Sequence, residues 1–363
     1  MKILHVITSL RTGGAERLVA ELAWRQDAVE VLLFDGTRTP LVEELEKDGI
    51  KVHALGKGEA AMQNPMLLFA LRRFLRQHPF DIVHTHNTAC QLLAAMTPGI
   101  TRITTEHNAS NRRRSWCWFK PIDRWMYGRY ERIACVGEET RQALSKWLGR
   151  PDLDARMTVI PNGIDLARIA HAVPAEDLAA TNGYKILMVS AFRPEKDQQT
   201  LIQAVIQLPE SYLLFLAGGA ETPENQKIMD ACKALARERQ DRIHFLGIRS
   251  DVPALLAAAD VIVLSSKHEG MSLSMLEGMA SGKPLIASDV PGLRELVSGA
   301  GILFPQGDAK ALAARIQEVC ENPEKAREIA QNCLARALQY DIAETARKYR
   351  ELYASVLSDG NVS

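Results

Sequence analysis

Short apolar segments alternate with longer amphipathic ones along most of the chain. In the first half, apolar or β-branched runs predict β-strands at residues 2–7, 30–34, 51–55, 81–85, 101–105, 132–136 and 157–160. Apolar residues spaced three and four apart predict intervening helices, including 15–25, 41–48, 65–77 and 138–148. Several of these strands are apolar at nearly every position, as in a parallel sheet covered on both faces. We expect a doubly wound α/β domain.

The same pattern restarts near residue 185. The segment KILMVS at 185–190 resembles KILHVI at 2–7, and further strands are predicted at 212–217, 243–245, 261–265, 285–287 and 302–304. Residues 168–182 contain no clear strand, which favours a linker. We therefore expect two Rossmann-like domains, residues 1–168 and 183–340. Because open parallel sheets bind ligands beyond the carboxyl ends of their strands, substrates should enter a cleft between them.

A terminal helix is predicted over residues 341–357. Its apolar side chains recur at helical spacing: Ile342, Ala346, Tyr349, Leu352, Tyr353 and Val356. A helix with such a stripe must bury it, and we expect it to pack back on the first domain.

Composition narrows the class of protein. The 363 residues are 47% apolar and 24% charged, as in ordinary globular proteins, and the apolar runs are far shorter than the ~20 residues that span a bilayer. With 44 basic and 44 acidic side chains, binding to nucleic acid is not expected. The six cysteines form no C-x-x-C pair, which favours reduced thiols and a cytoplasmic protein.

The segment SSKHEGMSLSMLEGMASGKPLIAS, residues 265–288, carries the most chemical information. It predicts a strand end, a loop, and a helix over about 272–280. Unpaired amides from Gly270 to Leu273, including those of Met271 and Ser272, would suit a diphosphate at the positive end of the helix dipole. Glu269 and Glu277 could accept hydrogen bonds from sugar and ribose hydroxyls. The alternative is an ordinary helix start with acidic neighbours.

These residues resemble a known family. The pair Glu269 and Glu277 in this context is similar to the signature of the retaining nucleotide-sugar glycosyltransferases of family 4, which have the GT-B fold. Other similar motifs cover essentially the whole chain: GGAER at 13–17, THN at 85–87, TEHN at 105–108, VIPNGID at 159–165, FRPEKD at 192–197, LAGG at 216–219, FLG at 245–247 and DVPALLAAADVIVLSS at 251–266.

The resemblance implies roles for both domains. The first would bind the acceptor and the second the nucleotide sugar. UDP is the expected nucleotide, because it is frequent in the family. Glu269 would contact the transferred sugar, Glu277 the ribose, and the amides from Gly270 to Leu273 the sugar and diphosphate. The family mechanism is front-face displacement with retention, in which the phosphate oxygen takes the acceptor's proton. A sugar-nucleotide epimerase on the same architecture is the alternative enzyme.

The departing phosphates need positive charge, from a metal or from fixed cations. Lys196 falls on the family's lysine position, but Ala191 stands where the family has an arginine, and Arg193 follows two residues later. Either Arg193 replaces the missing cation or the chain is an impaired donor-binding homologue. The Asp152–Asp154 triplet spells a metal motif but lies in a polar turn, and no zinc spacing occurs, so we expect no metal and no other cofactor.

Other strand ends supply further candidates. His107, in TEHN, resembles the family's active-site histidine, and His84 and His86 end an earlier strand. Gly13 and Gly14 would let a phosphate or the acceptor approach the backbone. Gly218 and Gly247 are turn positions near the expected base site.

The acceptor side is predicted from residues 111–132, NRRRSWCWFKPIDRWMYGRYER. The segment contains seven basic and two acidic residues. It therefore accounts for the whole excess of positive charge in residues 1–168, which hold 24 basic and 19 acidic side chains. Such composition suits an anionic membrane surface and a lipid-linked glycan or lipopolysaccharide acceptor, with peripheral contact at the inner face of the cell membrane. The candidate contacts are Arg112, Arg113, Arg114, Trp116, Trp118 and Trp125. The alternative is that the aromatic rings fill the domain core.

Overall fold

The computed structural model describes residues 1–11, 13–56, 66–108 and 112–360, and it divides the chain into two compact units. Unit 1 is Met1–Gly163 with Ile342–Ser363, and unit 2 is Ile164–Asp341. Each unit contains one parallel sheet with helices on both faces, which confirms the doubly wound α/β class.

The sheet of unit 1 has seven strands in the order β3-β2-β1-β4-β5-β6-β7, and neighbouring strands are parallel. The strands are β1 (Ile3–Ile7), β2 (Val29–Leu33), β3 (Lys51–Ala54), β4 (Ile82–Thr85), β5 (Arg102–Glu106), β6 (Arg132–Cys135) and β7 (Met157–Val159). Every predicted strand is present within two residues of its predicted ends. The strand order reverses between β1 and β4, which makes their carboxyl ends the switch point where such sheets bind ligands.

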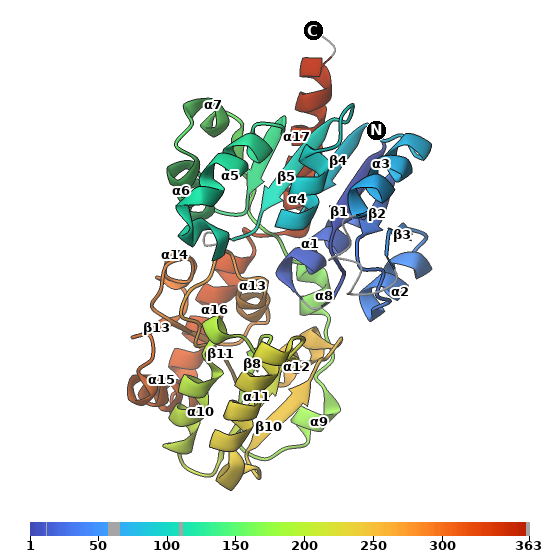
Figure 1. Cartoon of the computed structure of the whole chain (residues 1–363). Helices are drawn as coiled ribbons and strands as arrows, with labels where there is room; N and C mark the ends of the chain where they lie inside the picture. The colour runs from blue at the N-terminus through green and yellow to red at the C-terminus, as the bar shows by residue number, and fades with distance from the viewer. Residues whose placement is uncertain (12, 57–65, 109–111, 361–363) are drawn as a thin grey trace. The chain divides into compact units, whose positions relative to one another are not determined.

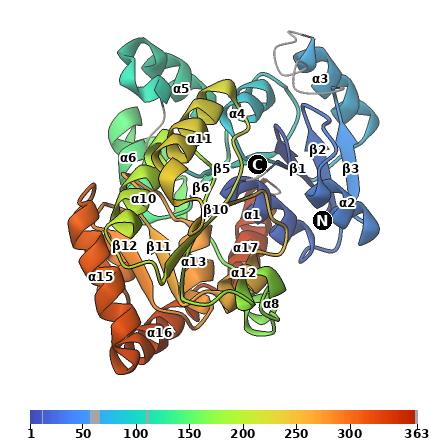
Figure 2. The same ribbon diagram turned by 90° about the horizontal axis from the view of Figure 1, so that it is seen from below.

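The helices of unit 1 form two layers around this sheet (Figures 1 and 2). One layer contains α3 (Leu67–Gln77), α4 (Thr88–Ala95), α5 (Lys120–Tyr127) and α6 (Glu138–Leu148), with the short α7 (Pro151–Asp154) beside α6. The other contains α1 (Gly14–Ala23), α2 (Pro40–Lys47) and α17 (Ile342–Gly360). The apolar stripe of α17 is buried against β1, β4, β5 and α1, so the end of the chain completes the first core.

Unit 2 repeats the architecture with six strands in the order β10-β9-β8-β11-β12-β13. The strands are β8 (Tyr184–Val189), β9 (Tyr212–Ala217), β10 (Ile243–Gly247), β11 (Val261–Leu264), β12 (Leu285–Ser288) and β13 (Ile302–Phe304). Two packed groups of helices accompany them. The first is α10 (Gln198–Ile206), α11 (Pro223–Leu235) and α15 (Ala309–Glu321), and the second is α12 (Val252–Ala258), α13 (Leu273–Ala280) and α16 (Pro323–Ala337). Its switch point lies between β8 and β11.

The segment predicted as a linker is folded. Seven of the fifteen residues 168–182 belong to two short helices of unit 2, α8 (Leu166–Ala170) and α9 (Glu176–Ala179). Ile169, Ala175 and Leu178 are buried in the core of this unit, where α8 and α9 contact α12. These three apolar side chains are enough to dock a largely polar segment on the core. The absence of a strand pattern, from which the linker was predicted, does not exclude such docking.

Within the described residues, no helix combines the length and the apolar character needed to cross a membrane. All six cysteines are free thiols, and Cys90, Cys135, Cys232 and Cys333 are buried.

Candidate active site

In unit 2, the loops at the ends of β8 and β11 bring two predicted residues together. Lys196 ends the 3₁₀ turn η4 (Pro194–Lys196), and its Nζ lies 2.5 Å from Oε1 of Glu269, in the loop after β11. Ser266 donates a hydrogen bond of 2.6 Å to the same oxygen. The side chains of Lys196 and Glu269 are only 17% and 9% exposed, so this ion pair is largely sheltered from water.

The backbone beside Lys196 is held in an unusual conformation. Asp197 has φ +50°, in the left-handed region that costs a non-glycine residue roughly 1 kcal/mol. Its carboxylate accepts hydrogen bonds from Thr200 Oγ1 at 2.8 Å and Gln306 Nε2 at 3.1 Å, while Ser265 Oγ donates to its carbonyl oxygen at 2.9 Å. These bonds offset the strain and fix the turn that directs Lys196 toward Glu269.

The helix that follows Glu269 begins without a side-chain cap. Ser272 is the N-cap residue of α13, yet its hydroxyl lies 3.1 Å from the Ser274 hydroxyl and makes no bond to the helix amides. The first turn holds no acidic residue. The amides and the dipole of this turn therefore remain directed at whatever lies beside Glu269 and Gly270, as an anion site requires. Glu277, half-buried, is one turn further along the helix.

Gly292 is a site residue that the sequence reasoning missed. It has φ +81°, and a Cβ there would lie 2.3 Å from the Glu269 carbonyl oxygen and 2.7 Å from that of Gly270. Only glycine lets the chain after β12 pass this close beneath the Glu269 loop. The Pro291-Gly292 dipeptide, a common turn signal, was the available clue.

The other predicted residues of unit 2 have distinct surroundings. Gly218, with φ +155°, donates its amide to the Gly247 carbonyl at 2.8 Å, and a Cβ on it would lie 1.9 Å from the Ser190 carbonyl oxygen. Gly218 therefore allows the end of β9 to approach the residue after β8, whereas a Cβ on Gly247 would meet nothing within 4 Å. Arg193 precedes η4 and is half-buried, and its guanidinium contacts no partner in the described part of the chain.

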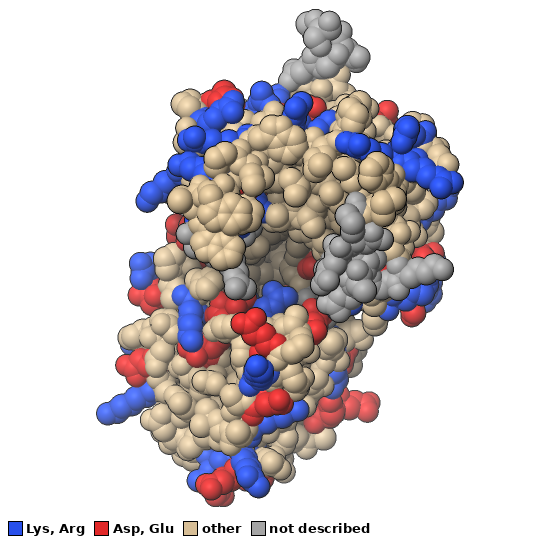
Figure 3. All heavy atoms as spheres, in the orientation of Figure 1, with Lys and Arg blue, Asp and Glu red and all other residues tan. Residues whose placement is uncertain are grey.

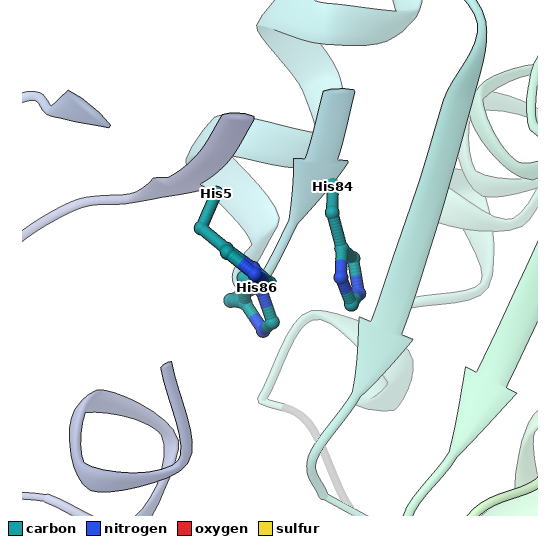
Figure 4. A group of neighbouring side chains, drawn as sticks. All are labelled: His5, His84 and His86. Atoms are coloured by element: carbon teal, nitrogen blue, oxygen red, sulfur yellow. Dashed lines mark hydrogen bonds between the residues drawn. The ribbon is translucent and has the colours of Figure 1, made fainter. Parts of the chain in front are cut away.

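In unit 1, His107 follows β5 and is joined to other histidines. Its Nε2 lies 3.3 Å from Nδ1 of His86, whose Nε2 lies 2.9 Å from Nδ1 of His5. The Nε2 of His5 lies 2.9 Å from Oε1 of Gln26. The sequence did not identify His5 as a site residue, because its contacts depend on the parallel pairing of β1 with β4, which places it opposite His84. Figure 4 shows the rings of His5 and His86 against one another, with His84 beside them.

These rings are held in their neutral form. Burial lowers the pKa of His5 to about 4 and that of His86 well below its ordinary value. Removal of water from the half-buried His107 ring lowers its pKa to about 4. Each ring therefore carries one proton at neutral pH.

The two glycines after β1 do not form an open anion site in this structure. Gly13 is the extended N-cap residue of α1, and the carboxylate of Glu16 lies over it, only 2.1 Å from where a Cβ would be. A glutamate at the third helical position reaching back to the N-cap is a capping arrangement. A phosphate at Gly13 or Gly14 would have to displace it.

Two of the predicted membrane-contacting arginines are not at the surface, which corrects that prediction. Arg113 Nε lies 3.0 Å from Asp123, and Arg114 pairs with Glu106 at 2.9 Å, each side chain being 10% exposed or less. Long-range pairing with these acids draws both guanidinium groups inward. The side chain of Arg112 lies outside the described residues, as does Asn111 at the start of the predicted segment.

The aromatic residues of the segment divide into two sets. Tyr127 and Tyr130 are fully buried, as the core-packing alternative expected. Trp116, Trp118 and Trp125 are 48%, 60% and 42% exposed, and the Trp116 and Trp118 rings are stacked with centroids 5.9 Å apart.

Comparison with known proteins defines the class. The family model "Glycosyltransferase Family 4" matches residues 12–168, and "Glycosyl transferases group 1" matches residues 173–335. A similar solved structure is Alr3699/HepE of Anabaena in complex with UDP and glucose, with a TM-score of 0.86, 23% identity, and coverage of 98% of this chain and 100% of that one. The fold is therefore GT-B, and the protein is a glycosyltransferase.

Full-length relatives agree. An Escherichia coli UDP-Gal:α-D-GlcNAc-diphosphoundecaprenol α-1,3-galactosyltransferase is 26% identical, covering 98% of this chain and 97% of the relative. A GDP-mannose:cellobiosyl-diphosphopolyprenol α-mannosyltransferase of Xanthomonas oryzae is 25% identical with the same coverage. With its two halves matched in order by the two family models, the chain belongs to glycosyltransferase family 4.

Proposed function

We propose that this protein transfers a sugar from a UDP-sugar to a lipid-linked saccharide, with retention of configuration and without a metal ion, in the synthesis of a surface polysaccharide or lipopolysaccharide. The observation that carries the proposal is the Lys196–Glu269 ion pair beside the uncapped start of α13. It combines a fixed cation, a row of amides and a carboxylate within one loop cluster.

Each part has a chemical task. Lys196 has three N–H donors, so it can keep one on Glu269 and direct another to a phosphate oxygen. The amides of Gly270 to Leu273 and the α13 dipole stabilise the remaining phosphate charge as the sugar–phosphate bond breaks. Glu269 binds a hydroxyl of the transferred sugar, and Glu277 the ribose. The acceptor oxygen forms the new bond on the face that the diphosphate leaves, and its proton passes to a phosphate oxygen.

The reaction is tested by measuring release of nucleoside diphosphate with and without a diphosphoprenol-linked saccharide, with EDTA present, and by assigning the product anomer by NMR. We expect release only with acceptor, resistance to EDTA and retention. Lys196→Ala should lower turnover by about 10²–10³-fold, the usual loss for a group that stabilises developing negative charge. The matched control is Lys325→Ala, which breaks a surface pair with Glu318 in the same unit. Equal activity of both variants, or inversion, would refute the mechanism.

The base of the donor needs its own test, since the two relatives use UDP-galactose and GDP-mannose. A thermal-shift series with UDP-, GDP- and ADP-sugars separates them, because a ligand that binds only the folded state raises Tm. We expect UDP-sugars to give the largest shift. A larger shift with a GDP-sugar would overturn this part of the proposal.

The acceptor places the enzyme at a membrane surface, and the exposed tryptophans are the proposed contact. Trp116, Trp118, Ile122 and Trp125, here called the Trp surface, are each at least 41% exposed and lie on or beside α5. Lys and Arg side chains gather along the upper rim of unit 1 in Figure 3. Tryptophan rings at headgroup level with nearby basic groups suit peripheral binding to an anionic cytoplasmic leaflet.

Flotation with vesicles of neutral or anionic phospholipid tests this contact. We expect binding to anionic vesicles, reduced several-fold in the Trp116→Ser/Trp118→Ser variant and by high salt. Ile248→Ser is the control, because Ile248 is 60% exposed, as Trp118 is, but belongs to unit 2. Equal flotation of both variants, or none by the unaltered protein, would exclude the Trp surface as the contact.

A further inference from the structure

A continuous chain of side-chain hydrogen bonds runs through the interior of unit 1 and ends at His107. It links Gln26, His5, His86 and His107 by contacts of 2.9, 2.9 and 3.3 Å. His5 is on β1, His86 follows β4 and His107 follows β5, so the chain crosses three neighbouring strand positions at the switch point. His5 and His86 are 0% and 1% exposed.

The directions of these bonds depend on one another. A neutral imidazole has one N–H donor and one acceptor nitrogen, and two facing nitrogens cannot both carry the shared proton. The Gln26 carbonyl oxygen only accepts, so Nε2 of His5 donates to it and Nδ1 of His5 must accept. Consequently Nε2 of His86 donates, Nδ1 of His86 accepts, and Nε2 of His107 is the next donor.

We infer that His5 and His86 are positioning residues that fix the proton of His107 on Nε2 and leave its Nδ1 as a hydrogen-bond acceptor. In the described part of the chain Nδ1 of His107 makes no hydrogen bond, so this lone pair is available to a substrate hydroxyl. The choice is set three hydrogen bonds away, by the orientation of the Gln26 amide. The role of this acceptor in catalysis rests on the proposed function, whereas the tautomer itself does not.

His84 belongs to the same cluster but not to the chain. Its Nδ1 lies 2.7 Å from the Tyr353 hydroxyl and its Nε2 lies 2.8 Å from Thr105 Oγ1. His84 therefore connects the sheet to α17, and a change there does not interrupt the path from Gln26 to His107.

The same three rings also meet the distance criterion for a metal centre. The ligand nitrogens of His5, His84 and His86 lie within 4.8 Å of one another. Two observations favour the hydrogen-bond chain. Every ring nitrogen of the three already has a partner. Among the described residues, this candidate ligand group includes no carboxylate, so a divalent ion would bring two uncompensated charges into a buried site.

The test is the ¹⁵N spectrum of histidine-labelled protein without substrate, since protonated and unprotonated ring nitrogens have well-separated shifts. In the unaltered protein, we expect His107 to carry its proton on Nε2. In Gln26→Leu, whose change does not touch His107, we expect its signals to move toward a mixture of both tautomers. Gln91→Leu is the control, because Gln91 is also buried and donates a hydrogen bond to Thr104, outside the chain.

A second variant protects the test against misfolding. His86→Phe keeps a ring but removes the link, and should give the same mixture, whereas His84→Phe should leave the His107 signals unchanged. With donor and acceptor, we expect turnover of His86→Phe to fall about tenfold with little change in KM, a modest loss for a misplaced group. Three results would overturn the inference: a proton on Nδ1 in the unaltered protein, unchanged His107 signals in both Gln26→Leu and His86→Phe, or stoichiometric Zn²⁺ binding that shifts His5, His84 and His86. If the unaltered protein shows the expected tautomer of His107 but transfers no sugar to the acceptor, the result would instead count against the proposed function.

Discussion

The switch points of the two units hold polar groups in opposite states. In unit 1, neutral rings form hydrogen bonds under the cover of α17, and burial depresses their pKa values. In unit 2, Lys196 and Glu269 form an ion pair in loops beside an uncapped helix. The same fold thus places neutral, hydrogen-bonded rings at the strand ends of unit 1 and an ion pair in the strand-end loops of unit 2. We therefore expect acid to destabilise the histidine chain of unit 1. Loss of a cation or a change in loop geometry should instead impair the charged cluster of unit 2.

The largest expected effect is acid destabilisation of unit 1. The pKa of His5 is about 4 in the folded protein, against an ordinary value of 6.5. Between about pH 6.5 and pH 4, the unfolded chain therefore binds a proton at His5 that the folded chain does not bind. Stability is therefore complete above pH 6.5 and falls as pH drops toward 4. By this linkage, His5 alone should cost about 2 kcal/mol at about pH 5, and His84, His86 and His107 shift in the same direction.

All five tryptophans lie in unit 1, so their fluorescence during urea unfolding reports on that unit alone. The free energy of unfolding measured this way should drop between pH 7 and pH 5, and less steeply in His5→Gln. His244→Gln, in unit 2, should leave the slope unchanged. A pH-independent transition would show that the histidines are not buried as neutral rings.

Sequence patterning located the strands well but the site only in part, for physical reasons. A buried parallel strand is a local apolar run, so β1 and β11 were visible without knowledge of their neighbours. The His5–His86 contact joins residues 81 positions apart, and the Arg113–Asp123 pair depends on how α5, which carries Asp123, packs. The net basic charge of segment 111–132 therefore suggested an exposed patch, although Asp123 within it and Glu106 outside it pair with Arg113 and Arg114 inside the fold. Lys196 and Glu269 were found because each follows a strand end in a motif that the resemblance supplied.

The next effect concerns the loop geometry of unit 2. Gly292→Ala places a methyl group 2.3 Å from the Glu269 carbonyl oxygen at φ +81°, so the loop must shift, at a cost of roughly 1–3 kcal/mol. Gly307→Ala isolates the contact, because Gly307 has φ +79° and nothing within 4 Å of its Cβ position. We expect Gly292→Ala to lose both stability and transfer activity, and Gly307→Ala only some stability. Equal activity losses would mean that backbone strain, rather than the Glu269 contact, is responsible.

The smallest expected effect tests whether Arg193 replaces the arginine that the family has at the position of Ala191. The guanidinium of Arg193 has no partner in the described part of unit 2 and follows the strand end where the family places its arginine. If Arg193 binds the leaving phosphates, Arg193→Ala should lower kcat about tenfold, as loss of about 1.4 kcal/mol of transition-state stabilisation would. Ala191→Arg in that background should restore most of the rate, since it returns a cation to the family position. An Arg193→Ala enzyme with unchanged kcat would instead mean that Lys196 and the α13 amides carry the phosphate charge by themselves, and that the charged cluster of unit 2 is smaller than the family pattern implies.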